Sequence, residues 1–151
     1  MPHAISQNFL TSTRTIERLL NLTDITTDDH VWEIGTGKGH ITRRLICRAG
    51  QVTTIEIDKK LCAALVPAFK DKPGLRLIQG DFLKARLPDA QPYKVFANIP
   101  FCITTEIVRK LLTHRNLPQD CWLIMEKGAA KRFMGLPRET VQSIPLKAFF
   151  E

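Results

Sequence analysis

At 151 residues, the chain is long enough for one domain with a sizeable core and short for two. Apolar residues make up 44% and charged residues 25%, which is typical of a globular protein and excludes wholesale disorder. The 22 Lys and Arg against 15 Asp and Glu give a net charge of +7. This surplus is compatible with a nucleic acid or an anionic membrane as partner but requires neither.

Cysteine spacing and hydropathy exclude further classes. Cys47, Cys62, Cys102 and Cys121 are far apart, with no CxxC pair and no cluster with histidine. We therefore expect free thiols in a reducing compartment, and neither a metal site nor a disulfide framework. The N-terminus lacks the pattern of a secretory signal, and no apolar run approaches the ~18 residues that span a bilayer. The sequence predicts a soluble cytoplasmic domain without a membrane partner.

Helix and strand patterns alternate along the chain. The expected elements, in order, are helix 11–21, strand 31–34, helix 40–49, strand 51–57, helix 61–69, strand 75–78, strand 93–97, helix 104–112, strand 121–125 and a sixth strand over 143–149. No helix is evident in residues 81–92. The alternation predicts an α/β fold with a mostly parallel sheet and flanking helices.

Polar or glycine-rich segments follow four of the predicted strands. These segments are Gly35 to Gly39, Glu56 to Asp58, Gly80 to Phe82 and Asn98 to Phe101. Ligands of open parallel sheets bind at the carboxyl ends of the strands. We therefore expect these segments to meet at one edge of the sheet and to form a binding site.

The glycine segment lies between a predicted strand and a predicted helix. Glycine allows a sharp turn and a close approach of backbone to ligand. The dinucleotide fingerprint GxGxxG needs glycine where His40 stands, and a P-loop needs Ser or Thr after Lys38, where Gly39 stands. Both phosphate-binding interpretations are therefore weakened, and a tight turn without a ligand stays an alternative.

Two acids follow the next strands. Glu56 stands 21 positions after Gly35, an offset at which a carboxylate accepts hydrogen bonds from the hydroxyls of a ribose. Asp81 is placed to accept a bond from the exocyclic amine of adenine. Each acid taken alone is equally compatible with a solvated turn residue. Together with the glycine segment, they favour a cofactor that contains adenosine but no pyrophosphate.

The corner Asn98-Ile99-Pro100-Phe101 follows the strand 93–97. Proline disfavours a helical conformation at Ile99, so we expect the corner to be extended. The Asn98 carboxamide and the Pro100 carbonyl can then accept hydrogen bonds from one –NH₂ group, and the Phe101 ring can stack on a flat base. Turn capping by Asn98 and core packing by Phe101 are the alternatives.

These segments together resemble the ribosomal RNA adenine N6-methyltransferase family, and within it the Erm-type enzymes of macrolide–lincosamide–streptogramin B resistance. The resemblance rests on Gln7-Asn8-Phe9-Leu10, Glu33 to Thr42 (EIGTGKGHIT), Ile55 to Asp58, Gly80 to Leu83 and Asn98 to Phe101, which stand in family order between about Gln7 and Arg132. Thr36 and Ile99 favour the Erm type over the sister group that methylates small-subunit RNA, which usually has GPGxG and NLPY.

The resemblance implies a Rossmann-like class I S-adenosylmethionine-dependent methyltransferase fold over residues 1–151. It implies methyl transfer, with dimethylation expected, to N6 of an adenosine in 23S ribosomal RNA. S-adenosylmethionine would contact Asn8, Leu10, Gly35, Gly37, Glu56, Asp81 and Asn98. The target adenine would be held by Asn98, Pro100 and Phe101, the last of which is Tyr in many relatives. The expected partner is ribosomal RNA, bound by a monomer.

The implied reaction is an in-line displacement in which hydrogen bonds to Asn98 and Pro100 orient the amine, so that positioning rather than a strong base provides catalysis.

Basic residues that could contact RNA phosphates are Arg109, Lys110, Arg115, Lys127, Lys131 and Arg132. Family members continue past position 151 and add a small helical domain, so we expect a C-terminally truncated enzyme. Alternatives are a cofactor-binding remnant with little RNA methylation, the small-subunit sister enzyme, a nicotinamide-dependent oxidoreductase and a non-enzymatic nucleic-acid-binding domain.

Overall fold

The computed structural model describes residues 10–136, so Asn8 and the predicted sixth strand over 143–149 lie outside the described residues. The elements are α1 (Thr13–Leu20), β1 (His30–Ile34), α2 (His40–Leu45), β2 (Gln51–Glu56), α3 (Lys59–Phe69), β3 (Leu75–Gln79), the 3-10 turn η1 (Phe82–Lys84), β4 (Lys94–Asn98), the 3-10 turn η2 (Phe101–Ile103), α4 (Thr104–Thr113), β5 (Cys121–Ile124) and α5 (Lys127–Phe133). The predicted alternation of helices and strands is confirmed over this range.

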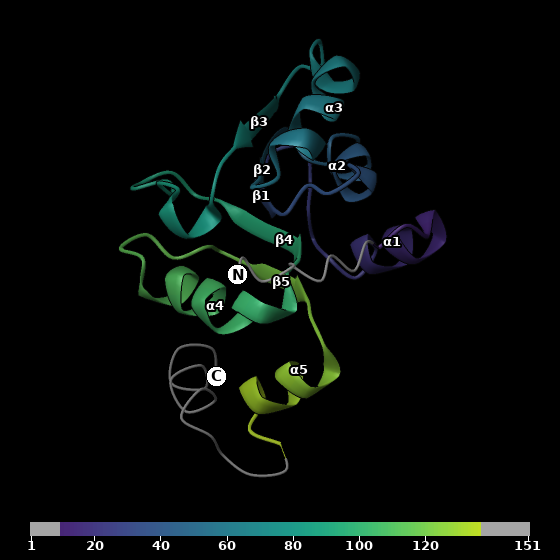
Figure 1. Ribbon diagram of the computed structural model, residues 1–151. Helices are drawn as coiled ribbons and strands as arrows, with labels where there is room; N and C mark the ends of the chain where they lie inside the picture. Colours follow the sequence, from purple (N-terminus) through teal and green to yellow (C-terminus); the bar gives the residue numbers. More distant parts are fainter. Residues whose placement is uncertain (1–9, 137–151) are drawn as a thin grey trace.

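The five described strands form one sheet in the order β3-β2-β1-β4-β5, and every neighbouring pair is parallel (Figure 1). The prediction of an α/β fold with a parallel sheet is therefore confirmed. The chain builds outward from β1 to β3 and then returns to place β4 on the other side of β1. The strand order thus reverses between β1 and β4, which is where open parallel sheets bind ligands.

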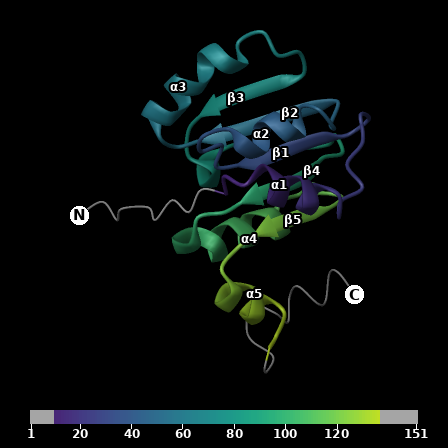
Figure 2. The same ribbon diagram turned by 90° about the vertical axis from the view of Figure 1, so that its right-hand side faces the viewer.

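Helices cover both faces of the sheet (Figures 1 and 2). The side chains Ile16 and Leu20 of α1 and Ile41 and Leu45 of α2 form one core cluster, which includes Val31, Val52 and Phe96 of the strands. The other cluster joins Ile107 and Leu111 of α4 and Phe82 of η1 to Trp32, Ile34, Ile55, Val95 and Ala97. Alternate strand residues point to opposite faces, so each strand contributes to both cores.

Capping residues set where the helices begin. The Ser12 hydroxyl accepts a hydrogen bond from the Thr15 N–H at 3.3 Å, so α1 begins at Thr13, two residues after the predicted start. The Asp58 carboxylate accepts bonds from the N–H groups of Lys60 and Leu61 at 2.7 and 3.2 Å. Helix α3 therefore begins at Lys59, two residues before the predicted start.

Two local features, the end of α2 and the presence of α5, differ from the sequence prediction, and a third agrees with it. Helix α2 ends at Leu45 rather than at Ala49, because the bonds from Cys47 N–H to Arg44 and from Arg48 N–H to Leu45 tighten the chain into turns. The connection from β3 to β4 contains η1 and no α-helix, in agreement with the lack of a helical pattern in residues 81–92. Helix α5 was not predicted.

Candidate active site

A crevice opens between β1 and β4 at the carboxyl edge of the sheet. These strands are paired only at Val31 with Lys94 and Trp32 with Val95, whereas β1 and β2 are paired along their whole length. A Cβ on Gly35 would lie 3.8 Å from the Asn98 carbonyl oxygen, so the glycine segment and the corner face each other across the crevice. A cavity of about 30 Å³ lies here, and its lining includes Leu10, Gly35, Gly37 and Asn98.

Four of the seven predicted cofactor residues therefore line one cavity at the point where the strand order reverses. The cavity is too small to enclose a nucleoside, so it accounts only for the innermost part of such a ligand. Glu56 is the last residue of β2 and Asp81 comes two residues after the end of β3, so both lie along the same edge, outside this cavity.

The glycine segment has a left-handed backbone conformation that residues with a side chain rarely adopt. Gly35, Gly37 and Gly39 have φ values of +79°, +55° and +76°. A Cβ on Gly39 would also lie 3.0 Å from the Phe69 ring, so a side chain there would require α3 to shift. The turn directs the Gly37 N–H toward Glu56, to whose carboxylate it donates a hydrogen bond of 2.7 Å.

The Glu56 carboxylate is buried, with 3% of the residue exposed. One oxygen accepts from the Gly37 N–H at 2.7 Å and the other from the Asp58 N–H at 2.9 Å. A carboxylate has about four acceptor positions, so these two bonds leave acceptor capacity for two hydroxyl groups. The remaining acceptor positions therefore fit the predicted ribose contact, and Glu56 also fixes the glycine segment to the end of β2.

Asp81 caps the short turn η1. Its carboxylate accepts a hydrogen bond from the Leu83 N–H at 2.9 Å, and the residue is partly exposed. The turn-capping alternative is thus realised, and the second carboxylate oxygen keeps the acceptor chemistry needed for an adenine amine.

The corner at the end of β4 is extended at Pro100, with φ −63° and ψ 132°. Ile99 is buried, whereas Asn98, Pro100 and Phe101 are each partly exposed at the edge. The Pro100 carbonyl accepts weak bonds of 3.3 Å from the Ile103 N–H and the Thr104 hydroxyl. The last residue of η2 and the first residue of α4 thereby hold the carbonyl that is predicted to face the target amine.

Glu33, in strand β1 two residues before Gly35, is fully buried. The Thr42 hydroxyl donates to its Oε2 at 2.6 Å, and its Oε1 has no hydrogen-bond partner among residues 10–136. Burial raises the pKa of Glu33 to about 7, although the hydroxyls of Thr42 and Thr54 favour the charged form. From the sequence alone, Glu33 has no predicted role beyond its place in the motif.

Because of the buried Glu33, we expect the stability of the fold to depend on pH. Its pKa is about 7 in the fold against 4.5 for a glutamate in water, so the folded state binds the proton more tightly. The free energy of unfolding should fall by up to about 3 kcal/mol as the pH rises from about 4.5 through 7. Urea unfolding at several pH values should show this slope in the wild type and a smaller one in Glu33→Gln, which mimics the protonated acid. Equal slopes would contradict the prediction.

The basic residues predicted to contact RNA differ in exposure. Arg109, Arg115, Lys127, Lys131 and Arg132 are exposed. Lys110 is partly buried, and its ammonium donates to the backbone carbonyls of Leu83 and Ala85. The expectation that Lys110 contacts phosphates is therefore replaced by a contact within the protein.

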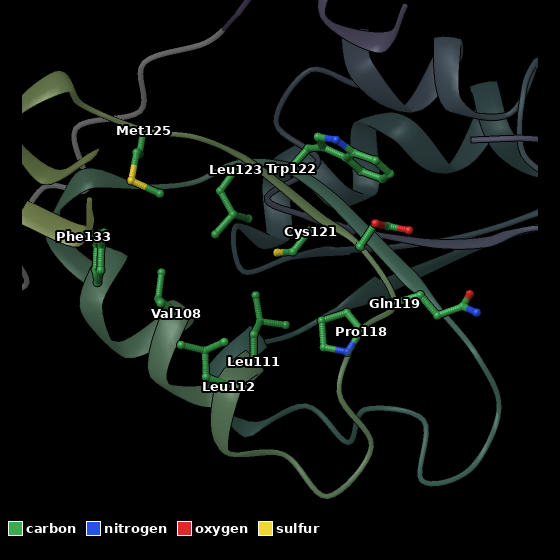
Figure 3. Close-up of a pocket in the computed structure, with 11 residues that line it drawn as sticks. Val108, Leu111, Leu112, Pro118, Gln119, Cys121, Trp122, Leu123, Met125 and Phe133 are labelled. Carbon is green, nitrogen blue, oxygen red and sulfur yellow. The ribbon is translucent and has the colours of Figure 1, made fainter. Parts of the chain in front are cut away.

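A second, larger cavity of about 460 Å³ lies between α4, β5 and α5 (Figure 3). Its lining is mainly apolar and includes Val108, Leu111, Leu123, Met125 and Phe133. It contains none of the residues predicted for the cofactor or the target base, so its size alone does not make it the candidate active site.

Within residues 10–136, no helix is long and apolar enough to cross a membrane, and no cluster of metal-ligating side chains occurs.

Comparison with a solved structure defines the class of protein. The crystal structure of the 23S rRNA methyltransferase ErmE superposes with a TM-score of 0.76 at 32% identity, over 85% of this chain and 52% of that one. The chain thus has the Rossmann-like fold of class I S-adenosylmethionine-dependent methyltransferases, as predicted.

Sequence comparison then defines the family. Residues 3–144 match the family described as ribosomal RNA adenine dimethylase, and the chain belongs to this family. An rRNA adenine N-6-methyltransferase of Lysinibacillus sphaericus is 40% identical over 133 residues, which are 88% of this chain and 54% of that protein. The ribosomal RNA small subunit methyltransferase A of Dehalococcoides mccartyi is 37% identical over 134 residues, 86% of this chain and 46% of that protein. The chain therefore spans about half the length of these relatives.

Proposed function

We propose that residues 1–151 form a catalytic, S-adenosylmethionine-binding domain that methylates N6 of an adenosine in 23S ribosomal RNA, with dimethylation as the expected outcome. The observation that carries the proposal is the cavity at the strand-order reversal, whose lining brings Gly35 and Gly37 opposite Asn98. The names of the relatives support rRNA adenine as the substrate class. Resistance to macrolide-type antibiotics and a cytoplasmic location are parts of the same proposal.

The cofactor would lie along the carboxyl edge of the sheet. Leu10, Gly35 and Gly37 would contact its inner part, Glu56 its ribose and Asp81 its adenine, with Asn8 added from the sequence resemblance. The acceptor capacity of the buried Glu56 carboxylate fits two ribose hydroxyls. When bound, S-adenosylmethionine supplies an electrophilic methyl group on a sulfonium.

The protein's part in the reaction is to position the target base. The Asn98 carboxamide and the Pro100 carbonyl accept hydrogen bonds from the exocyclic amine, which draws electron density toward its nitrogen. The Phe101 ring stacks on the base, a contact worth roughly 1–3 kcal/mol. The exposed Arg109, Lys127 and other basic side chains near α4 and α5 contact RNA phosphates.

The test uses the 151-residue chain, tritiated S-adenosylmethionine and protein-free 23S and 16S rRNA in separate reactions. We expect label in 23S rRNA, and a single reverse-transcription stop at a dimethylated adenine. Calorimetric titration with S-adenosylmethionine runs in parallel, and heat-denatured chain serves as the control.

Two other outcomes identify the alternatives. Label confined to 16S rRNA would favour the small-subunit enzyme, which the 37% identity to the Dehalococcoides mccartyi protein supports as a second candidate. Cofactor binding without label in either RNA would identify a cofactor-binding remnant.

A further inference from the structure

Lys110 of α4 is directed into the protein rather than toward solvent. Its Nζ donates hydrogen bonds to the Leu83 carbonyl at 2.9 Å and to the Ala85 carbonyl at 2.5 Å. The ammonium also lies over the Phe82 ring, 5.2 Å from the ring centroid. One side chain therefore contacts three residues, Phe82, Leu83 and Ala85, of the connection between β3 and β4.

These carbonyls lie at the end of η1, where a helical turn leaves backbone acceptors without partners inside the turn. The backbone bonds within the turn run from Lys84 N–H to Asp81 and from Ala85 N–H to Phe82, at 3.0 and 3.1 Å. Because the connection contains no α-helix, the lysine supplies charge-assisted bonds that the turn cannot make for itself.

Asp81 caps the other end of the same turn through the Leu83 N–H. Residue 83 is thus held on its N–H by Asp81 and on its carbonyl by Lys110. Burial lowers the pKa of Lys110, and the nearby charge of Asp81 raises it, so the two side chains interact electrostatically as well. A change at Lys110 is therefore transmitted to the position of the Asp81 carboxylate.

Helix α4 supports the corner as well as the turn. The Thr104 hydroxyl, at its first residue, shares its one hydrogen between the carbonyls of Pro100 and Phe101, which lie at 3.3 and 3.2 Å. Lys110 stands on the same helix, six positions further along the chain. The helix consequently links the segment proposed to hold the target adenine to the segment proposed to hold the cofactor's adenine.

We infer that Lys110 is a positioning residue that holds η1 so that Asp81 recognises the exocyclic amine of the cofactor's adenine. This inference rests on the proposed function, because it takes Asp81 as the adenine contact. Lys110 touches neither the cofactor nor the target base, and acts through the backbone of residues 83–85.

The experiment measures adenine preference, which a general loss of stability would not change selectively. S-adenosylhomocysteine and its hypoxanthine analogue, which lacks the exocyclic amine, are titrated calorimetrically into the wild type, Lys110→Met and Lys110→Arg. Lys84→Met is the matched control, because Lys84 is an exposed cation in the same turn. Circular dichroism establishes that each variant is folded, and Lys110→Gln, which keeps an uncharged –NH₂ donor group, replaces Lys110→Met if that variant does not fold.

We expect the wild type to bind the adenine compound more tightly, and Lys110→Met to lose about tenfold of this preference, the size of one charge-assisted hydrogen bond. Lys110→Arg and Lys84→Met should keep the preference. An unchanged preference in Lys110→Met, an equal loss of affinity for both compounds, or no preference in the wild type would overturn the inference. A wild-type chain that binds neither compound would overturn the proposed function itself, and this inference with it.

Discussion

Replacing Asn98 by alanine should lower the rate of methyl transfer about a hundredfold or more, while the affinity for S-adenosylmethionine changes only a few fold. The reason is that the proposed role of the carboxamide is to accept a hydrogen bond from the target amine, which strengthens as the nitrogen attacks. The backbone carbonyl of residue 98, which faces Gly35 across the crevice, is kept in the variant. The Ile99 N–H also keeps its 3.1 Å bond to the Ile124 carbonyl, so the corner should stay in place.

Two measurements separate these effects. Calorimetry gives the cofactor affinity, and incorporation of tritiated methyl into ribosomal RNA gives the rate. Gln119→Ala is the matched control, because it removes an exposed carboxamide at the opposite, amino edge of the sheet. Comparable losses of affinity and rate in Asn98→Ala would contradict this division of labour and assign Asn98 mainly to cofactor binding.

The sheet was predictable because each strand is a short apolar or β-branched run that stops at a polar or glycine residue. Strand β2, for example, was predicted over 51–57 and spans Gln51–Glu56. The helix ends were less predictable, since they depend on single side-chain bonds such as the one that Asp58 makes at the start of α3. Helix α5 was missed because only Ala129 among its residues is buried, so its sequence has no apolar periodicity.

The meeting of the glycine segment with the Asn98 corner was also predictable, because parallel strands place their carboxyl ends at one edge. The internal bonds of the site were not. Lys110 and the Leu83 carbonyl are 27 positions apart, and no spacing rule relates them. Likewise, the raised pKa of Glu33 follows from burial beneath α2, which a motif does not encode. Sequence patterns indicated which residues gather, whereas the partners of each polar atom required three-dimensional distances.

Substitution of Glu56 should have a second large effect, because the Glu56 carboxylate joins the glycine segment to β2 before any ligand binds. Its two oxygens each accept one backbone N–H, from Gly37 at 2.7 Å and from Asp58 at 2.9 Å. Glutamine has nearly the same shape but only one carboxamide oxygen. In Glu56→Gln, one of the two N–H groups must therefore face an –NH₂ group, whichever way the amide is turned.

We expect Glu56→Gln to lower the free energy of unfolding by about 1–3 kcal/mol, the cost of a buried donor without a partner. Cofactor affinity should fall tenfold or more, because the glycine segment loses a fixing bond and the ribose loses acceptor positions. Urea unfolding and calorimetry measure the two quantities, with Glu106→Gln, an exposed acid of α4, as the control. If stability falls but affinity does not, Glu56 acts only as a backbone clamp, and the ribose must be bound by another residue. If neither changes, the buried carboxylate is not what holds the glycine segment in its ligand-binding shape.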